Sequence, residues 1–341
     1  MAGSRQAHGV RQRAGTDRRM STPLGAVGGE GSDSGAPTYT YLGPEGTFTE
    51  AALLQVPGAD TATRIPATSV SAALEMVRSG RADAAVVPIE NSVEGGVSAT
   101  LDAISTGDPL RIQREILVSI TFVLAVRPGL ELADISTVST HSHAWAQCRD
   151  WADKNIPQAE YLPASSTAAA ATGLASTKPG YDAAICSPLV AERLGLEVLR
   201  RDIGDVADAV TRFVLLSAGP GLPAPTGADK TTLVVPLPED HPGALMEILD
   251  QFSTRGVNLS RIESRPTGLF LGDYFFSIDA DGHIGDARMA DALKGLHRIS
   301  PKLRFLGSYP RADHREPEIP KHTSDEAFRS ADLWLQGLLK D

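Results

Sequence analysis

The chain has 341 residues, of which 42% are hydrophobic and 22% are charged, and its formal net charge is −10. This composition is typical of a folded protein with two or three domains rather than of a disordered chain. The acidic balance argues against nucleic-acid binding, and the longest apolar run, at residues 120–126, is too short to cross a membrane. With two cysteines and no signal peptide, the chain is expected to be cytoplasmic.

The first 217 residues divide into a tail and a repeated unit. Residues 1–37 are rich in Gly, Ser, Arg and Ala without periodicity, which predicts a disordered tail. In residues 38–217 a short apolar strand, a Ser or Thr, and an amphipathic helix follow one another repeatedly, which predicts an α/β fold with a largely parallel sheet. The apolar passage at residues 114–126 indicates a crossover, so we expect two α/β lobes with a cleft between them.

The composition changes after residue 217. Residues 218–229 are rich in Pro and Gly and read as a linker. Residues 230–310 follow a β-α-β-β-α-β order, which is the ferredoxin-like arrangement, and a small module after a linker is more often regulatory than catalytic. Residues 311–341 end in an amphipathic helix that we expect to dock on a neighbour. Its apolar face comprises Phe328, Ala331, Leu335 and Leu338.

Polar residues gather where predicted strands end, which is where α/β sheets bind ligands. In GPEGTFTE (43–50), Thr47 and Glu50 form a capping box, and a plain helix cap is the alternative to a ligand site. Glu90 directly follows a predicted strand, where an Asx turn is the alternative. Serines and a threonine open a third helix and could donate hydrogen bonds to a carboxylate. The candidate ligand-binding residues are Pro44, Glu45, Gly46, Thr47, Asn91, Ser92, Ser165, Ser166 and Thr167.

The stretch VADAVTRFVLL (206–216) places a threonine and an arginine at the entrance of a buried strand. If this strand runs antiparallel to its neighbours, its start lies at the same edge as their carboxyl ends. Alternation then places Thr211 and Phe213 on the cleft side and Arg212 on the other side, braced by a carboxylate such as Glu45 or Glu90. An ordinary strand threonine with a paired edge arginine is the alternative.

No cofactor or metal is expected from the sequence. His141, His143 and Cys148 lack zinc-ligand spacing, and no nucleophile elbow marks a catalytic triad. The cysteines Cys148 and Cys186 read as small core residues.

Several motifs in a fixed order together resemble one family. They are GPEGTFTEAAL (43–53), PIENSVEGGV (88–97), TRF (211–213), GALMEIL (243–249) and IESRP (262–266). The chain resembles prephenate dehydratase with a C-terminal ACT domain, in the form without a chorismate-mutase segment. The resemblance implies a two-lobed catalytic region like a periplasmic binding protein, followed by a ferredoxin-like regulatory domain.

The resemblance also implies an activity: conversion of prephenate to phenylpyruvate, with loss of carbon dioxide and the ring hydroxyl and without a cofactor. Thr211 is then the catalytic residue, with Arg212 and Glu90 beside it. Phe213 and the loop residues named above hold the substrate. A threonine hydroxyl is too weak an acid to be a free proton source, but it can donate a hydrogen bond that tightens in the transition state.

ACT domains of this family bind an amino acid at a dimer interface, so the resemblance implies L-phenylalanine as effector and a homodimer or homotetramer. An ordinary helix start and surface strand are the alternative for these segments. The residues expected to bind phenylalanine are Gly243, Ala244, Leu245, Asn258, Leu259, Glu263, Ser264 and Arg265.

The sequence departs from the family pattern at two cleft-side places. Ala209 stands where the family usually has Asn, and His141-Ser142-His143 replaces His-Pro-Gln. Arogenate dehydratase, whose substrate carries an amino group in place of the keto oxygen, is not separated from prephenate dehydratase by the sequence. The sequence is also compatible with a non-catalytic two-lobed solute-binding protein and with an inactive amino-acid sensor.

Overall fold

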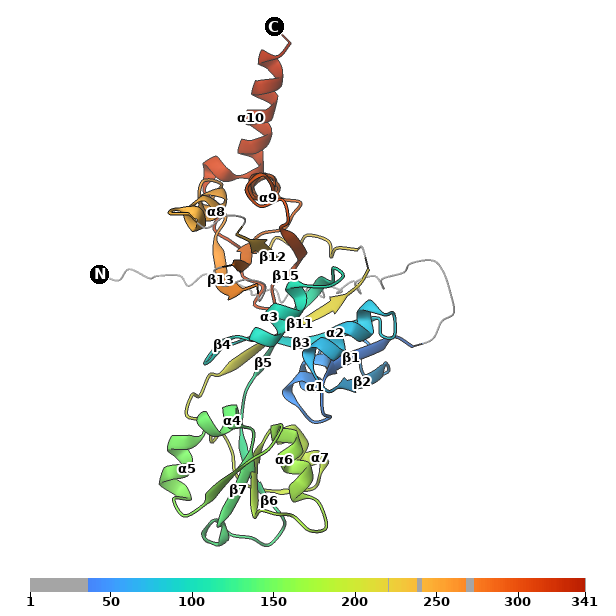
Figure 1. Ribbon diagram of the computed structural model, residues 1–341, viewed down its shortest axis with the longest axis vertical. Helices are drawn as coiled ribbons and strands as arrows, with labels where there is room; N and C mark the ends of the chain where they lie inside the picture. Colours follow the sequence, from blue (N-terminus) through green and yellow to red (C-terminus); the bar gives the residue numbers. More distant parts are fainter. Residues whose placement is uncertain (1–35, 220, 238–240, 268–272, 341) are drawn as a thin grey trace, which may run out of the picture. The chain divides into compact units, whose positions relative to one another are not determined.

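The computed structural model describes residues 36–219, 221–237, 241–267 and 273–340. Nearly all of the predicted N-terminal tail therefore lies outside the described residues. The described chain forms three sheets with helices between their strands (Figure 1). The predicted α/β fold class, with two sheets in the first part of the chain and a third in the last part, is confirmed. The prediction of a largely parallel sheet is wrong, because both sheets of the first part combine parallel and antiparallel pairs.

The first lobe is built on a mixed sheet of order β2-β1-β3-β11-β5, with β4 paired to β3. β1 is parallel to β2 and β3, whereas β11 is antiparallel to β3 and β5. Its strands are β1 (Thr38–Leu42), β2 (Thr63–Ala67), β3 (Ala84–Asn91), β4 (Gly95–Gly96), β5 (Arg111–Ser119) and β11 (Val210–Ser217). Its helices are α1 (Phe48–Leu53), α2 (Val70–Arg78) and α3 (Ser98–Ser105).

The second lobe has a sheet of order β10-β6-β9-β7-β8, and the chain enters it between β5 and β6, within the predicted crossover. Its strands are β6 (Val123–Val126), β7 (Thr137–Thr140), β8 (Glu160–Pro163), β9 (Ala183–Cys186) and β10 (Glu197–Arg200). Its helices are α4 (Ser142–Ala146), α5 (Arg149–Asn155), α6 (Thr167–Leu174) and α7 (Pro188–Arg193), with the 3-10 turn η1 (Leu132–Asp134).

The strand–Ser/Thr–helix unit predicted from the sequence has a local cause. Ser69, Ser166 and Ser187 each stand at a helix N-cap and accept a hydrogen bond from the backbone N–H three residues later. Such caps satisfy one of the amide groups that a helix leaves unpaired at its start. The capping residues therefore fix where each helix begins, directly after a strand.

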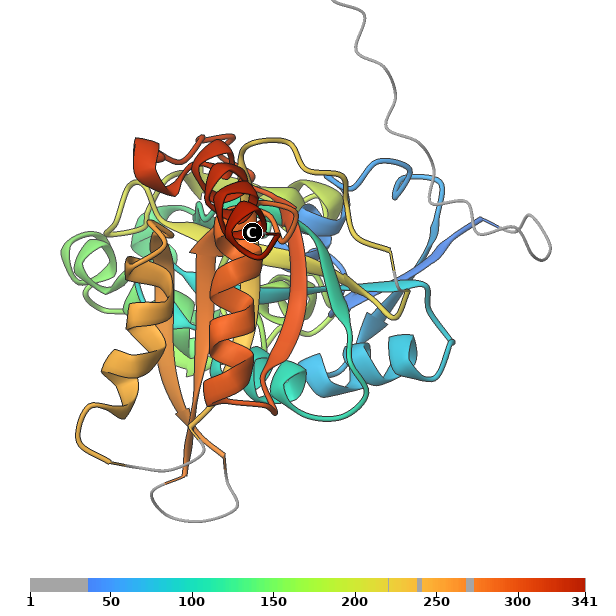
Figure 2. The same ribbon diagram turned by 90° about the horizontal axis from the view of Figure 1, so that it is seen from above.

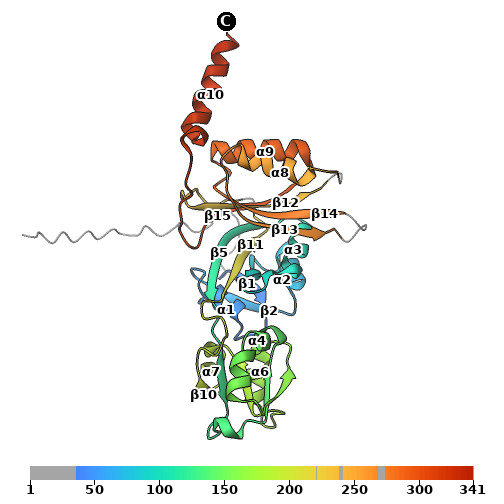
Figure 3. The same cartoon turned by 90° about the vertical axis from the view of Figure 1, so that its left-hand side faces the viewer.

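The C-terminal region has an antiparallel sheet of order β13-β14-β12-β15, whose chain order β-α-β-β-α-β matches the ferredoxin-like prediction. Its elements are β12 (Asp229–Pro236), α8 (Ala244–Ser253), β13 (Leu259–Pro266), β14 (Tyr274–Asp281), α9 (Ala287–Ile299) and β15 (Arg304–Pro310). Figures 2 and 3 show α8 and α9 side by side on one face of this sheet.

The other face of the C-terminal sheet shares a hydrophobic core with the first lobe. Val234, Phe275, Leu306 and Tyr309 are buried in one cluster with first-lobe residues such as Ile112. Alternation along the strands explains this arrangement, because neighbouring residues such as those of β14 point to opposite faces. The segment predicted as a linker thus joins two parts that pack together.

The chain ends in the 3-10 turn η2 (Lys321–Thr323) and helix α10 (Asp325–Leu338). The predicted apolar face is present, but only its first turn has a neighbour: Phe328 is partly buried, whereas Leu335 and Leu338 are 51% and 54% exposed. Among the described residues, the expected docking is therefore not made beyond that turn. Within the described ranges, no helix is long and apolar enough to span a membrane.

Candidate active site

A pocket of about 340 Å³, which we call the cleft pocket, is lined by residues of both lobes. It brings together most of the hydroxyl-bearing candidates from separate loops. The predicted residues that line it are Thr47, Asn91, Ser165, Ser166, Thr167, Thr211 and Phe213. Lining residues outside the predicted set include Phe48, Thr49, Thr68, Ile120, Phe122, His141, His143 and Gln147.

Strand β11 brings Thr211 to this pocket. Because β11 is antiparallel to β3, its start lies beside the end of β3, and Thr211 is paired in register with Asn91. The alternation predicted from the sequence is confirmed, since Thr211 and Phe213 line the cleft pocket and Arg212 does not. A shift of register between Arg212 and Phe213 marks a β-bulge at this point.

Asn91 orients the hydroxyl of Thr211. Its Oδ1 accepts hydrogen bonds from the backbone N–H groups of Val93 and Glu94, at 2.8 and 3.2 Å. Its Nδ2 must then point the other way, and it donates to Thr211 Oγ1 at 2.9 Å. Because Thr211 Oγ1 accepts this hydrogen bond, the proton of the hydroxyl remains available for a ligand in the pocket.

The polar lining of the cleft pocket suits an anion. Its described lining residues carry hydroxyl, amide and imidazole groups but no carboxylate. Ser166 caps α6, whose first backbone N–H groups are directed toward this end of the helix. Burial lowers the pKa of His141, and the neighbouring His143 lowers it further while Glu94 opposes the shift. Neutral hydrogen-bond donors therefore dominate the site.

Two sets of contacts connect the lobes beside the pocket. Glu94 of the first lobe contacts His143 and accepts a hydrogen bond from Gln147 Nε2 at 3.1 Å. Glu50 of the first lobe forms an ion pair with Arg193 of α7 at 2.9 Å. Burial by itself raises the pKa of Glu50, but hydrogen bonds from Arg193 and from the Gly46 N–H bring it below its usual value. The predicted capping box is thus only half formed, since Glu50 accepts from Gly46 rather than from the N-cap residue.

The other predicted cleft residues do not line the pocket: Pro44, Glu45, Gly46, Glu90, Ser92 and Arg212. Gly46 has a φ of 81°, and a Cβ there would lie 2.6 Å from Val190 Cγ2, so glycine is required for packing. Ser92 Oγ accepts from the Val210 N–H at 2.9 Å and holds the start of β11. Glu90 braces Arg212 at 3.2 Å, as predicted.

Arg212 is buried on the face of β11 away from the cleft pocket. Its side chain is 6% exposed, and it reaches Glu115 of β5 and Asp279 of β14 at 2.6 and 2.5 Å. Burial alone lowers the pKa of the guanidinium, but Asp279, Tyr309 and Glu115 raise it well above its usual value. The arginine therefore stays charged, and its partners include residues of the C-terminal region.

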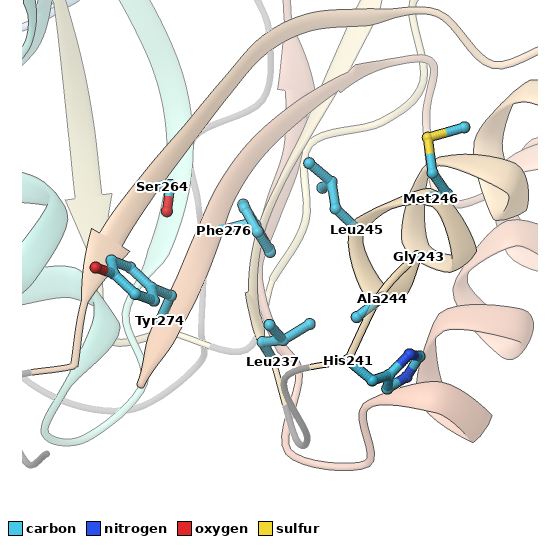
Figure 4. Close-up of a pocket in the computed structure, with 9 residues that line it drawn as sticks. All are labelled: Leu237, His241, Gly243, Ala244, Leu245, Met246, Ser264, Tyr274 and Phe276. Carbon is cyan, nitrogen blue, oxygen red and sulfur yellow. The ribbon is translucent and has the colours of Figure 1, made fainter. Parts of the chain in front are cut away.

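A second pocket, of about 350 Å³, lies at the start of α8 in the C-terminal region, and Figure 4 shows the side chains around it. We call it the C-terminal pocket. Of the residues expected to bind phenylalanine, Gly243, Ala244, Leu245 and Ser264 line it. The remaining lining residues, which lie outside the expected set, are Leu237, His241, Met246, Tyr274 and Phe276.

The remaining expected effector residues lie elsewhere because β13 alternates. Ser264 faces the pocket, whereas Arg265 pairs with Asp102 of α3 at 2.8 Å and Glu263 lies against Gly96 of β4. Asn258 donates to Asp281 at 2.7 Å, and Leu259 packs against the core under α8 and α9. The IESRP motif thus has one face toward the C-terminal pocket and one toward the first lobe.

Among the described residues, no group of three or more His, Cys, Asp or Glu side chains is arranged to hold a metal ion. Both cysteines are free and buried, and burial raises the pKa of each thiol to about 12. They are core residues rather than ligands or nucleophiles of the described pockets.

Residues 39–220 match the family model described as prephenate dehydratase. A curated prephenate dehydratase of Mycolicibacterium vanbaalenii is 46% identical over 315 residues, covering 89% of this chain and 98% of its own. The crystal structure of prephenate dehydratase from Arthrobacter aurescens in complex with L-Phe is 68% identical, with a TM-score of 0.86, covering 89% of this chain and 100% of that chain. A structure described as a novel type of quorum quenching acylase is 31% identical, with a TM-score of 0.72, covering 82% and 100%.

Proposed function

The chain belongs to the prephenate dehydratase family, and we propose that it converts prephenate to phenylpyruvate in the cleft pocket. The observation that carries this proposal is the Thr211 hydroxyl, which Asn91 holds in the pocket with its proton free. The neighbour described as an acylase is 31% identical, below the 46% and 68% of the two prephenate dehydratases. The higher identities favour the dehydratase reaction.

The reaction needs a correctly oriented substrate and one proton for the departing hydroxide. The bond between the ring and its carboxylate breaks, and its electron pair becomes part of the aromatic ring as carbon dioxide leaves. The ring C–O bond breaks at the same time, and the departing hydroxide takes up a proton to become water. Thr211 stabilises that leaving oxygen by a hydrogen bond that strengthens as negative charge develops, or by relaying a proton. Aromatisation supplies the driving force, so no cofactor is required.

We assign substrate binding to the hydroxyl groups around the pocket. Ser165, Ser166 and Thr167 at the start of α6 can donate to a carboxylate of the substrate. Thr47 also lines the pocket, but its hydroxyl donates to Pro44 O at 3.0 Å. Phe213 supplies an apolar wall for the ring. Loss of the ring carboxylate is favoured where the pocket excludes water.

The cleft lining favours prephenate over arogenate. Arogenate carries an ammonium group, which needs an anionic partner when it is buried, and the described lining residues offer no carboxylate. We therefore expect kcat/KM for prephenate to exceed that for arogenate by at least about tenfold. Steady-state rates of phenylpyruvate and phenylalanine formation from the two substrates test this. No turnover of either would favour a solute-binding role, and equal or faster turnover of arogenate would reverse the assignment.

We also propose that L-phenylalanine binds the C-terminal pocket and inhibits turnover from there. Gly243 begins α8 with a φ of 95°, Ser264 offers a hydroxyl, and Leu237 and Phe276 offer an apolar wall for a phenyl ring. The Arthrobacter aurescens relative was crystallised with L-Phe. On this proposal, residues 38–217 are catalytic and residues 230–310 are a regulatory ACT domain, with a linker at 218–229.

We propose that a second copy of the chain covers the rim of this pocket, giving a homodimer or homotetramer. The rim carries exposed apolar side chains, with Met246 58% and Tyr274 41% exposed, and β13 is an edge strand of its sheet. Light scattering after size-exclusion chromatography should show an oligomer that Met246→Glu weakens. We place this activity in the cytoplasm, since the buried free thiols suit a reducing compartment.

A further inference from the structure

The guanidinium of Arg212 joins strand β11 to the C-terminal sheet. Nε donates to Glu115 of β5 at 2.6 Å, and Nη2 donates to the hydroxyl of Tyr309 at 2.8 Å. Nη1 donates to Asp279 at 2.5 Å and to Glu90 at 3.2 Å. Arg212 is the residue next to Thr211, so these contacts fix the backbone beside the hydroxyl that faces the cleft pocket.

Asp279 holds the other side of this junction. Its side chain is 0% exposed, and it accepts further hydrogen bonds from Arg261 Nε at 2.9 Å and Thr232 Oγ1 at 2.6 Å. These bonds leave the carboxylate little freedom within the C-terminal sheet. A displacement of β14 must therefore displace Arg212, or break a buried ion pair, which is strongly unfavourable.

The same strand reaches the C-terminal pocket from its opposite face. Phe276 lines that pocket, and Asp279, three residues later, faces the first lobe. β13 has the same arrangement, with Ser264 in the pocket and Arg261 bonded to Asp279. A ligand that moves these strands on the pocket side moves the carboxylate on the other side.

We propose that Asp279 is a positioning residue for the dehydratase reaction, which through Arg212 sets the place of the Thr211 hydroxyl and transmits the effect of a ligand in the C-terminal pocket. This inference rests on the proposed function of the cleft pocket. Arg212 and Thr211 are consecutive residues of β11 and pair with Glu90 and Asn91 at the end of β3, so a movement of Arg212 is passed directly to Thr211.

Asp281 provides a matched control for a purely structural role. It lies two residues further along β14, so it faces the same side of the strand, and it is also buried. Its carboxylate binds Arg311 at 2.6 Å and Asn258 at 2.7 Å, whereas the carboxylates that bind Arg212 are those of Glu90, Glu115 and Asp279. Asp279→Asn and Asp281→Asn both remove one buried carboxylate charge, but only the first acts on Arg212.

The experiment compares these variants in the full chain by steady-state kinetics with prephenate, by titration with L-phenylalanine, and by calorimetric L-phenylalanine binding. For Asp279→Asn we expect kcat to fall about 10- to 100-fold, the range expected when a reacting group is slightly misplaced, with KM nearly unchanged. L-phenylalanine should bind with its usual Kd, because Asp279 is not a lining residue, but it should inhibit the residual turnover only weakly. Asp281→Asn should keep both kcat and inhibition.

Tyr309→Phe is the milder variant if Asp279→Asn does not fold. It removes only the hydroxyl that accepts from Arg212 Nη2, and we expect kcat to drop several-fold while the fold is retained. A folded Asp279→Asn or Tyr309→Phe protein with wild-type kcat and full inhibition would overturn the proposal, as would an equal loss of kcat in Asp281→Asn. A wild-type protein that does not turn over prephenate would instead refute the proposed function.

Discussion

Replacing Thr211 by valine isolates the chemistry of one hydroxyl. Valine keeps the β-branched shape that Thr211 contributes to β11, so it creates almost no cavity in the strand. The Asn91 amide loses its acceptor at 2.9 Å, which should lower the free energy of unfolding by about 1 kcal/mol. If the hydroxyl stabilises the leaving oxygen, kcat should fall by about 10²–10⁴, the usual contribution of a positioned acid. That loss corresponds to about 3–5 kcal/mol of transition-state stabilisation.

The assay is the initial rate of phenylpyruvate formation over a range of prephenate concentrations, which separates kcat from KM. KM should change little, because the substrate carboxylates are held by other residues. Thr40→Val is the matched control: Thr40 is a buried strand threonine of the same sheet whose hydroxyl donates to Ile65 O at 3.0 Å, and it does not line the cleft pocket. A Thr211→Val enzyme that matched the Thr40→Val enzyme in kcat would refute the role assigned to this hydroxyl.

Three other outcomes are expected. Ser264→Ala removes a hydroxyl from the C-terminal pocket and should raise the Kd of L-phenylalanine, measured by calorimetry, about fivefold. Arg265→Ala, on the opposite face of β13, should leave this Kd unchanged. Equal effects of the two substitutions would contradict the assignment of faces. Burial raises the pKa of the Cys148 and Cys186 thiols in the folded protein to about 12. The contribution of each neutral thiol to the free energy of unfolding is therefore complete below the pKa of the same thiol in the unfolded chain. It is lost as the pH rises from that value toward the folded pKa. Each thiol should steepen the alkaline decline in urea-measured stability by about 1.4 kcal/mol per pH unit, and a Cys148→Ala protein with the wild-type slope would disprove this. Turnover should survive exhaustive chelation, because the described residues offer no metal-ligand group; activity restored only by a divalent ion would show the opposite.

The arrangement around Thr211 could be predicted because local rules determine it. Period-two alternation separates Thr211 and Phe213 from Arg212, and an antiparallel β11 brings its start to the strand ends of the cleft. Serine caps after apolar strands are likewise visible in the sequence. The same alternation places Ser264 at the C-terminal pocket and Glu263 and Arg265 on the opposite face of β13. The prediction that all three contact the effector did not take the period of the strand into account.

The partners of Arg212 could not be predicted in the same way. Asp279 lies 67 residues away in sequence and Tyr309 lies 97 residues away, and nothing local to either residue indicates a charged or phenolic neighbour on β11. Glu94 and Gln147 meet across the lobes for a similarly non-local reason. Long-range pairings depend on how the sheets pack, and packing follows from complementary surfaces that a single sequence does not display.

The junction between the first lobe and the C-terminal sheet combines two interactions with different physical character. The apolar contacts of Val234, Phe275 and Leu306 are worth about 1.5–3 kcal/mol each and have no preferred direction, so they keep the sheets together but tolerate sliding. The ion pair between Arg212 and Asp279 depends steeply on distance and angle once it is removed from water. A ligand in the C-terminal pocket does not need to separate the two parts. On the role proposed for Asp279, a small slide, tolerated by the apolar contacts and resisted by the ion pair, would change the position of the residue beside Thr211.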